Sequence, residues 1–184
     1  MQSFLPHPLS GLLFLSLFSC SSTKHNAPAP PQEKIIAAHA KKQKDHHLAL
    51  VRGNRPMLDD NKRLSLYYRT KQSLKLPEVR ELFVASVEEL IDLAKAESEW
   101  ETDDENQNFS IQHLDFLIGF MTEEARFFDP PSIAYAFLDQ ETICYCYYDR
   151  LFGTFTEYKD VKEPYAKALM LVREKEQNAS ENTR

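Results

Sequence analysis

Residues 76–99, LPEVRELFVASVEELIDLAKAESE, carry the strongest secondary-structure signal in the chain. Apolar side chains recur there at the spacing of one helical face, at Val79, Leu82, Phe83, Val87, Leu90, Ile91 and Ala94. Pro77 suits the first turn of a helix, and the carboxylate of Glu78 suits the positive end of the helix dipole. We interpret the opposite, charged face as solvated; it holds Arg80, Glu88, Glu89, Asp92 and Lys95. The stretch therefore predicts an amphipathic helix that covers a core.

The residues that follow, 109–149, predict a β meander. Apolar residues alternate at Leu114, Phe116, Ile118 and Phe120, which favours a strand. A helical stripe is the alternative for the same segment; it would use Ile111, Leu114, Leu117, Ile118 and Met121. The runs SIAYAFL (132–138) and TICYCYYD (142–149) flank Asp139-Gln140-Glu141 and predict a hairpin.

Two weaker elements complete the predicted fold. Residues 63–70 alternate and predict a short strand, and residues 160–177 predict a second amphipathic helix with Asp160 and Glu163 as a capping box. We predict an α+β fold, with a small antiparallel β meander packed against two amphipathic helices and preceded by a flexible tether. The predicted domain covers residues 56–177, and 178–184 form a disordered tail.

The first 20 residues contain an apolar run that ends at a cysteine. Residues Leu9 to Phe18 are mostly apolar, which is too short a run to span a bilayer but is the length of a signal-peptide core. A buried N-terminal helix is the alternative, and Pro6, Pro8 and Gly11 oppose it. We therefore assign residues 1–19 to a signal peptide.

Leu17-Phe18-Ser19-Cys20 resembles the lipobox of bacterial lipoprotein precursors. The resemblance covers residues 1–20 and implies cleavage before Cys20, with acyl chains on its sulfur and amine. It also implies a lipid anchor in the bacterial cell envelope, in the outer membrane rather than the inner one. A secretory signal with an ordinary cleavage site is the alternative, since Phe18 is bulky for its position and no Lys or Arg precedes the apolar run.

The charge distribution and the spacer fit a tethered domain. The net charge of −6 hides a basic first part, with +8 over residues 1–75, and an acidic middle, with −12 over residues 76–129. Residues 21–32, SSTKHNAPAPPQ, read as an extended spacer. We assign residues 20–55 to the lipidated cysteine and a flexible basic tether, within which 33–52 form at most a marginal helix. The basic arm lacks interleaved aromatic residues, which disfavours a nucleic-acid partner.

No catalytic motif is evident. The four glycines are isolated, and there is no Gly-x-Ser-x-Gly, His-Glu-x-x-His or Cys-x-x-Cys sequence. Cys144 and Cys146 share one face of a predicted strand; we interpret them as buried small hydrophobes that do not bridge each other, with a metal or redox pair as the alternative. His113 with Asp115 is a weak candidate for an oriented base, and His39, His46 and His47 lie in the flexible arm. We predict no metal and no cofactor.

Three functions follow in order of preference. The first is a non-catalytic, membrane-anchored envelope lipoprotein that binds another envelope protein. The candidate contact residues are tyrosines, because tyrosine is enriched at interface hot spots: Tyr135, Tyr145, Tyr147 and Tyr148. The second is a small-ligand or metal-binding lipoprotein that uses Cys144 and Cys146 or His113. The third is a hydrolase, which the lack of a nucleophile motif disfavours.

Overall fold

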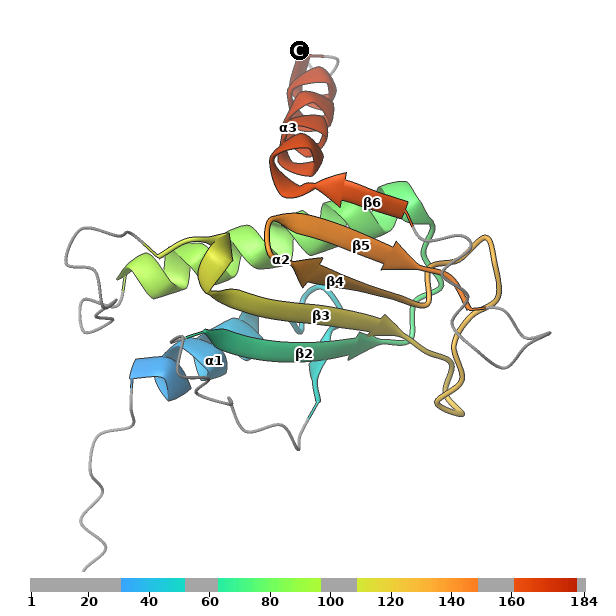
Figure 1. Ribbon diagram of the computed structural model, residues 1–184, viewed down its shortest axis with the longest axis horizontal. Helices are drawn as coiled ribbons and strands as arrows, with labels where there is room; N and C mark the ends of the chain where they lie inside the picture. The colour runs from blue at the N-terminus through green and yellow to red at the C-terminus, as the bar shows by residue number, and fades with distance from the viewer. Residues whose placement is uncertain (1–30, 52–62, 97–108, 149–160, 182–184) are drawn as a thin grey trace, which may run out of the picture.

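The structure is a computed structural model that describes residues 31–51, 63–96, 109–148 and 161–181 (Figure 1). It is an α+β fold with a six-stranded, mostly antiparallel sheet, as predicted. The elements, in chain order, are α1 (Pro31–Lys42), β1 (Ala49–Leu50), β2 (Leu64–Thr70), α2 (Leu76–Ala96), the 3-10 helix η1 (Ile111–His113), β3 (Leu114–Phe120), β4 (Tyr135–Asp139), β5 (Thr142–Cys146), β6 (Val161–Pro164) and α3 (Tyr165–Glu181).

The strands lie in the sheet in the same order as in the sequence, β1-β2-β3-β4-β5-β6. Neighbours are antiparallel except β2 and β3, which run parallel with Leu66 opposite Phe116. A parallel pair needs a crossover connection, and α2 lies within that connection. The predicted meander is therefore present as β3 to β5, and the sheet extends beyond it on both sides.

The predicted face of α2 is the centre of the core. Val79, Phe83, Val87 and Leu90 are fully buried, and Leu82 is half-buried against them. The strand interpretation of 114–120 is confirmed, because Leu114, Phe116, Ile118 and Phe120 all face this core. The side chain of Glu78 accepts a hydrogen bond from the backbone N–H of Lys75 at 2.8 Å, which caps the start of α2.

The structure corrects the predicted start of the folded domain, which we placed at Pro56. Residues 31–51 lie within the predicted tether, yet α1 packs against α2 and β1 pairs with β2. Ile35, His39 and Gln43 form the buried stripe of α1 and the turn after it. Two of these three side chains are polar, so the apolar periodicity that predicts a packed helix is weak here. The rest of the predicted tether lies outside the described residues.

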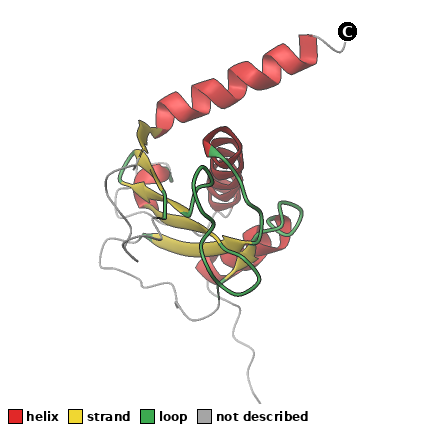
Figure 2. Cartoon of the chain, turned by 90° about the vertical axis from the view of Figure 1, so that its right-hand side faces the viewer, coloured by secondary structure: helices red, strands yellow, loops and turns green. Residues whose placement is uncertain are grey.

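The structure also corrects both ends of the last helix. Residues 161–164 form strand β6, so the predicted capping role of Glu163 is wrong and α3 begins at Tyr165. The predicted apolar face is confirmed, with Tyr165, Ala168 and Val172 buried and Leu169 packed against the core. Helix α3 continues to Glu181, into the predicted disordered tail. Figure 2 shows it leaving the end of β6 and running outward over the domain.

Candidate functional site

The sheet has two faces of different character. Helices α1 and α2 lie behind the sheet in the view of Figure 1, and α3 packs against α2. The face turned away from α2 carries half-buried side chains from three neighbouring strands, among them Tyr67, Leu117, Tyr135 and Phe137. Leu117 and Phe137 are direct cross-strand partners in β3 and β4. We call this surface the outer face.

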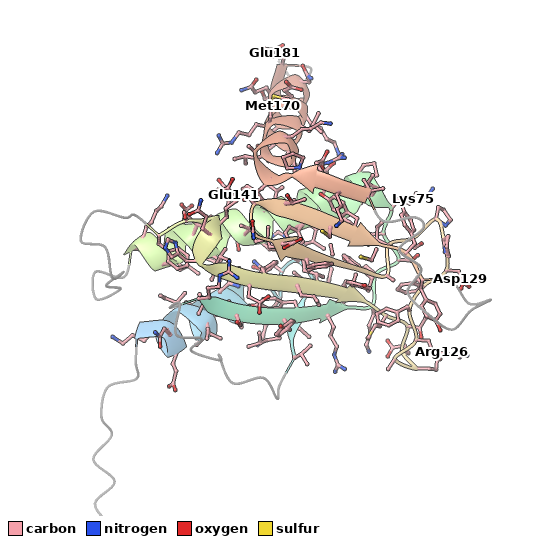
Figure 3. The ribbon with its side chains drawn as sticks, in the orientation of Figure 1. Lys75, Arg126, Asp129, Glu141, Met170 and Glu181 are labelled. Atoms are coloured by element: carbon pink, nitrogen blue, oxygen red, sulfur yellow. The ribbon has the colours of Figure 1, made fainter. Side chains whose placement is uncertain are left out.

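Four aromatic rings gather at one end of the outer face, the end marked by Arg126 and Asp129 in Figure 3. Tyr135 stacks on Phe137 with ring centroids 5.9 Å apart and an interplanar angle of 24°. Phe127, from the loop after β3, lies 6.3 Å from the ring of Tyr135 and 5.7 Å from that of Tyr148. We call Phe127, Tyr135, Phe137 and Tyr148 the aromatic cluster. All four side chains are half-buried, and the two tyrosines add hydroxyl groups to an otherwise apolar set.

The four predicted tyrosines divide between the two sides of the sheet. Tyr135 and Tyr148 belong to the aromatic cluster. Tyr145 is fully buried on the α2 side, where its hydroxyl donates to Glu163 Oε2 at 3.3 Å, so it is a core residue and not a contact residue. Tyr147 is half-buried against the core. Burial raises the pKa of Tyr145, and the neighbouring Glu163 carboxylate adds to that effect.

Sequence reasoning missed Phe127 and Phe137 as members of the site. The sequence pattern could have predicted Phe137, because this residue lies two positions after Tyr135 and so shares its face of the strand. No sequence pattern indicates Phe127. It reaches the cluster because the loop after β3 folds back and forms an isolated antiparallel bridge between Met121 and Phe127.

The two strand cysteines behave as predicted. Cys144 and Cys146 are buried, and neither forms a disulfide. In the register of β4 and β5 they lie opposite Phe137 and Tyr135, beside the aromatic cluster. They therefore act as small hydrophobic residues under the outer face. Within the described ranges, no group of three or more His, Cys, Asp or Glu side chains is placed to hold a metal ion.

The structure does not pair His113 with Asp115. The ring of His113 stacks on Phe109 with centroids 5.6 Å apart, and its Nδ1 accepts the backbone N–H of Ser110 at 3.2 Å. Asp115 Oδ2 instead accepts the hydroxyl of Tyr67 at 3.1 Å on the outer face. Partial burial raises the pKa of Tyr67, and the Asp115 carboxylate raises it further. This arrangement orients a phenol, and His113 and Asp115 do not form the predicted oriented base.

The charged face of α2 is partly covered, so its interpretation as solvated is confirmed for one part of the face and corrected for another. Glu88 accepts the hydroxyl of Tyr165 at 2.8 Å and pairs with Arg173 at 3.3 Å, while Glu81 pairs with Lys175. Helix α3 thus lies over this face through ion pairs and hydrogen bonds. Asp92 and Lys95 are exposed, as predicted.

A cavity of about 400 Å³ lies where α3 passes over α2. Its apolar lining comes from Leu82, Ala85, Val172 and Ala179, and charged groups including Lys175 and Glu176 border it. It does not include Cys144, Cys146 or His113, the residues named for a ligand site in the sequence.

The prediction that the charged face of α2 is solvated is also wrong for Arg80. Its guanidinium forms a fork with the carboxylate of Glu163 in β6, with Nε to Oε2 at 2.7 Å and Nη2 to Oε1 at 3.2 Å. Glu163 is only 6% exposed. Hydrogen bonding to Glu163 raises the pKa of Arg80, so the guanidinium stays charged.

A buried polar network holds α1 against α2 and β2. His39 Nδ1 lies 2.8 Å from the hydroxyl of Tyr68, and His39 Nε2 lies 2.8 Å from the backbone carbonyl of Ser86. Gln43 Nε2 donates to Glu89 Oε2 at 2.8 Å and also lies 3.1 Å from His39 Nε2. Gln43 Oε1 accepts from Ser86 Oγ at 2.7 Å. His39, which the sequence placed in a flexible arm, is thus a core residue.

Comparison with known proteins gives no relative. No family model, no curated protein and no solved structure matches this chain. In the described residues, no helix has the length and apolar character needed to cross a membrane. The predicted signal peptide and Cys20 lie outside the described residues.

Proposed function

We propose that this chain is a lipid-anchored protein of the bacterial cell envelope whose sheet domain binds another envelope protein through the aromatic cluster. The observation that carries the binding role is the contact between four rings from three separate segments on the outer face. Aromatic side chains dominate the energetics of protein interfaces, and tyrosine adds a hydroxyl that remains hydrogen-bonded at the edge. The proposal assigns no catalytic role to the domain.

The anchor in this proposal is Cys20. Each buried CH₂ of an acyl chain contributes ~0.8 kcal/mol to membrane binding, so two or more chains hold a protein firmly. Ten residues separate Cys20 from α1, and in an extended, proline-rich conformation they span about 30 Å. The folded domain would then stay close to the membrane surface.

Replacing Cys20 with alanine is expected to move most of the protein from the membrane fraction to the soluble fraction. The physical reason is that the variant has no thiol to receive the first lipid. The measurement is the distribution of the protein between sedimented membranes and supernatant, together with the intact mass of membrane-extracted protein. Cys144→Ala is the matched control, since it removes a buried thiol and leaves the anchor intact. Equal sedimentation of Cys20→Ala and the unchanged chain would contradict the proposal.

A photo-reactive amino acid at position 137 is expected to give one discrete cross-linked adduct in intact cells. The side chain at this position belongs to the aromatic cluster, so it would lie within reach of the bound partner. The control position is Ala166, which is exposed on α3 and away from the outer face. The same adduct at both positions, or none at position 137, would argue against binding through this face.

A further inference from the structure

Helix α1 and the residues after it are held to the domain by both apolar and polar groups. The three side chains that it and its following turn bury are Ile35, His39 and Gln43, which are 2%, 0% and 0% exposed. The opposite face of α1 is exposed and includes Glu33, Lys34, Lys41 and Lys42. Strand β1 adds two residue pairs with β2. Leu48 is also buried, and Ile36 and Leu50 pack against the core. The attachment of residues 31–50 therefore combines these apolar contacts with the hydrogen bonds of His39 and Gln43.

The hydrogen bonds of His39 suit a neutral ring, in which both ring nitrogens have partners. A backbone carbonyl can only accept, so the proton of the ring is on Nε2 and is donated to the carbonyl of Ser86. Nδ1 then accepts the hydroxyl hydrogen of Tyr68. A second proton on Nδ1 would remove the acceptor of the Tyr68 hydroxyl and place a cation where no water reaches it. The network is complete only while the imidazole is uncharged.

The groups around His39 do not compensate a positive charge. Tyr68 of β2 is neutral, and the aromatic ring from β3 next to the imidazole belongs to Phe116, with centroids 6.1 Å apart. The carboxylate of Glu89 on α2 favours protonation, whereas Lys42 and His46 oppose it. Burial outweighs these effects and lowers the pKa of His39 to about 4 from its usual 6.5.

The rest of the domain has a core of its own. The packing of α2 against β2 to β5 includes Phe83, Phe116, Ile118 and Ile143, all fully buried and none contributed by α1. A proton taken up by His39 therefore destabilises the attachment of one helix and not the whole sheet, which is the condition for local opening.

We propose that residues 31–50 form an acid-releasable clasp: in weak acid the imidazole of His39 takes up a proton, α1 leaves α2 and β2, and the surface around Tyr68 and Ser86 becomes accessible. This inference does not depend on the lipid anchor or on the aromatic cluster. The direction of the pH effect follows from the proton affinities of the docked and the released states. The docked state binds a proton less readily than the released state, so docking is at full strength above pH 6.5 and weakens as the pH falls toward 4.

Hydrogen exchange of the full chain, read by mass spectrometry and corrected for the intrinsic effect of pH, tests the clasp. Peptides from residues 33–46 are expected to open roughly 20-fold more often at pH 5 than at pH 7, from the shift of the histidine pKa. Peptides from α2 and β3 are expected to keep their protection. Carboxylic acids of ordinary pKa are mostly ionised at both pH values. Histidines ordinarily titrate in this window, and this segment also holds His47 and His46, which faces Glu89 at 3.7 Å, so a variant at position 39 is needed to identify the group.

His39→Gln supplies the key variant, because glutamine can donate to Ser86 and cannot become charged. The pH dependence of opening is expected to disappear in this variant. His47→Asn is the control; His47 is exposed, and asparagine tolerates its positive φ of 58°, so the response should persist. Opening that is independent of pH in the unchanged chain, an equal pH response in His39→Gln, or exposure of α1 only together with α2 would each overturn the clasp. If His39→Gln releases α1 already at pH 7, the clasp is tested by comparing opening at pH 5 and pH 7 in the unchanged chain and in His47→Asn. Opening that does not increase at pH 5 in these two chains would overturn the clasp.

Discussion

Arg80→Met is expected to lower the free energy of unfolding by about 3–5 kcal/mol, the usual cost of removing one partner from a buried ion pair. The variant leaves the carboxylate of Glu163 in the interior, with the hydroxyl of Tyr145 as its remaining hydrogen-bond donor among the described contacts. The pair also joins α2 to β6, the last strand of the sheet. Urea denaturation at pH 7 measures the effect.

Two further variants show whether burial of the charge is the cause. The double variant Arg80→Met/Glu163→Met removes both charges and should recover much of the lost stability. Lys175→Met breaks the exposed pair with Glu81 and should cost no more than about 1 kcal/mol. If Arg80→Met costs no more than Lys175→Met, leaving the Glu163 carboxylate without Arg80 does not carry the cost of an unpaired buried charge.

Phe116→Ala is the second substitution expected to have a large effect, a loss of about 3–5 kcal/mol. Phe116 is fully buried, and its ring lies 5.2 Å from that of Phe83, 5.7 Å from that of Tyr68 and 6.1 Å from that of His39. Its removal leaves a cavity where α1, α2, β2 and β3 meet. The same denaturation measurement applies.

Phe137→Ala is the matched control, since it truncates the same residue type in the next strand but on the outer face. We expect it to cost roughly 1 kcal/mol, because a half-buried ring loses less contact area on truncation. Its main effect should be on binding through the aromatic cluster. Equal losses from the two variants would contradict the assignment of an inner and an outer face.

The elements that the sequence predicts are those in which burial coincides with apolar character. Helix α2 is such an element, because seven apolar residues at helical spacing face the core. The hairpin of β4 and β5 is another, since its two strands are separated by a short polar turn in which Gln140 adopts a left-handed conformation with φ of 56°. In both cases local pattern and tertiary packing agree.

Helix α1 shows the limit of this reasoning. Two of the buried positions in α1 and the turn after it are His39 and Gln43, which only a structure pairs with Tyr68, Ser86 and Glu89. The ion pair of Arg80 with Glu163 is hidden for a related reason, because 83 residues separate its partners. Long-range polar pairs leave no periodicity in the sequence.

The division of the tyrosines was unpredictable for a different reason. In β5 both sides of the strand are buried, with Ile143 and Tyr145 on one and Cys144 and Cys146 on the other. Alternation then tells which residues share a side but not which side faces the helices. Only the register with β4, where Cys146 lies opposite Tyr135, assigns Tyr145 to the core.

Because the strands lie in the sheet in chain order, the first and the last strand form its two opposite edges. Neighbouring strands are about 4.8 Å apart, so crossing the sheet from β1 to β6 covers roughly 24 Å. If the chain is fixed to a membrane at its N-terminal end, the connection to the anchor starts from the β1 side of the sheet, and β6 with the C-terminal helix α3 lies at the opposite edge.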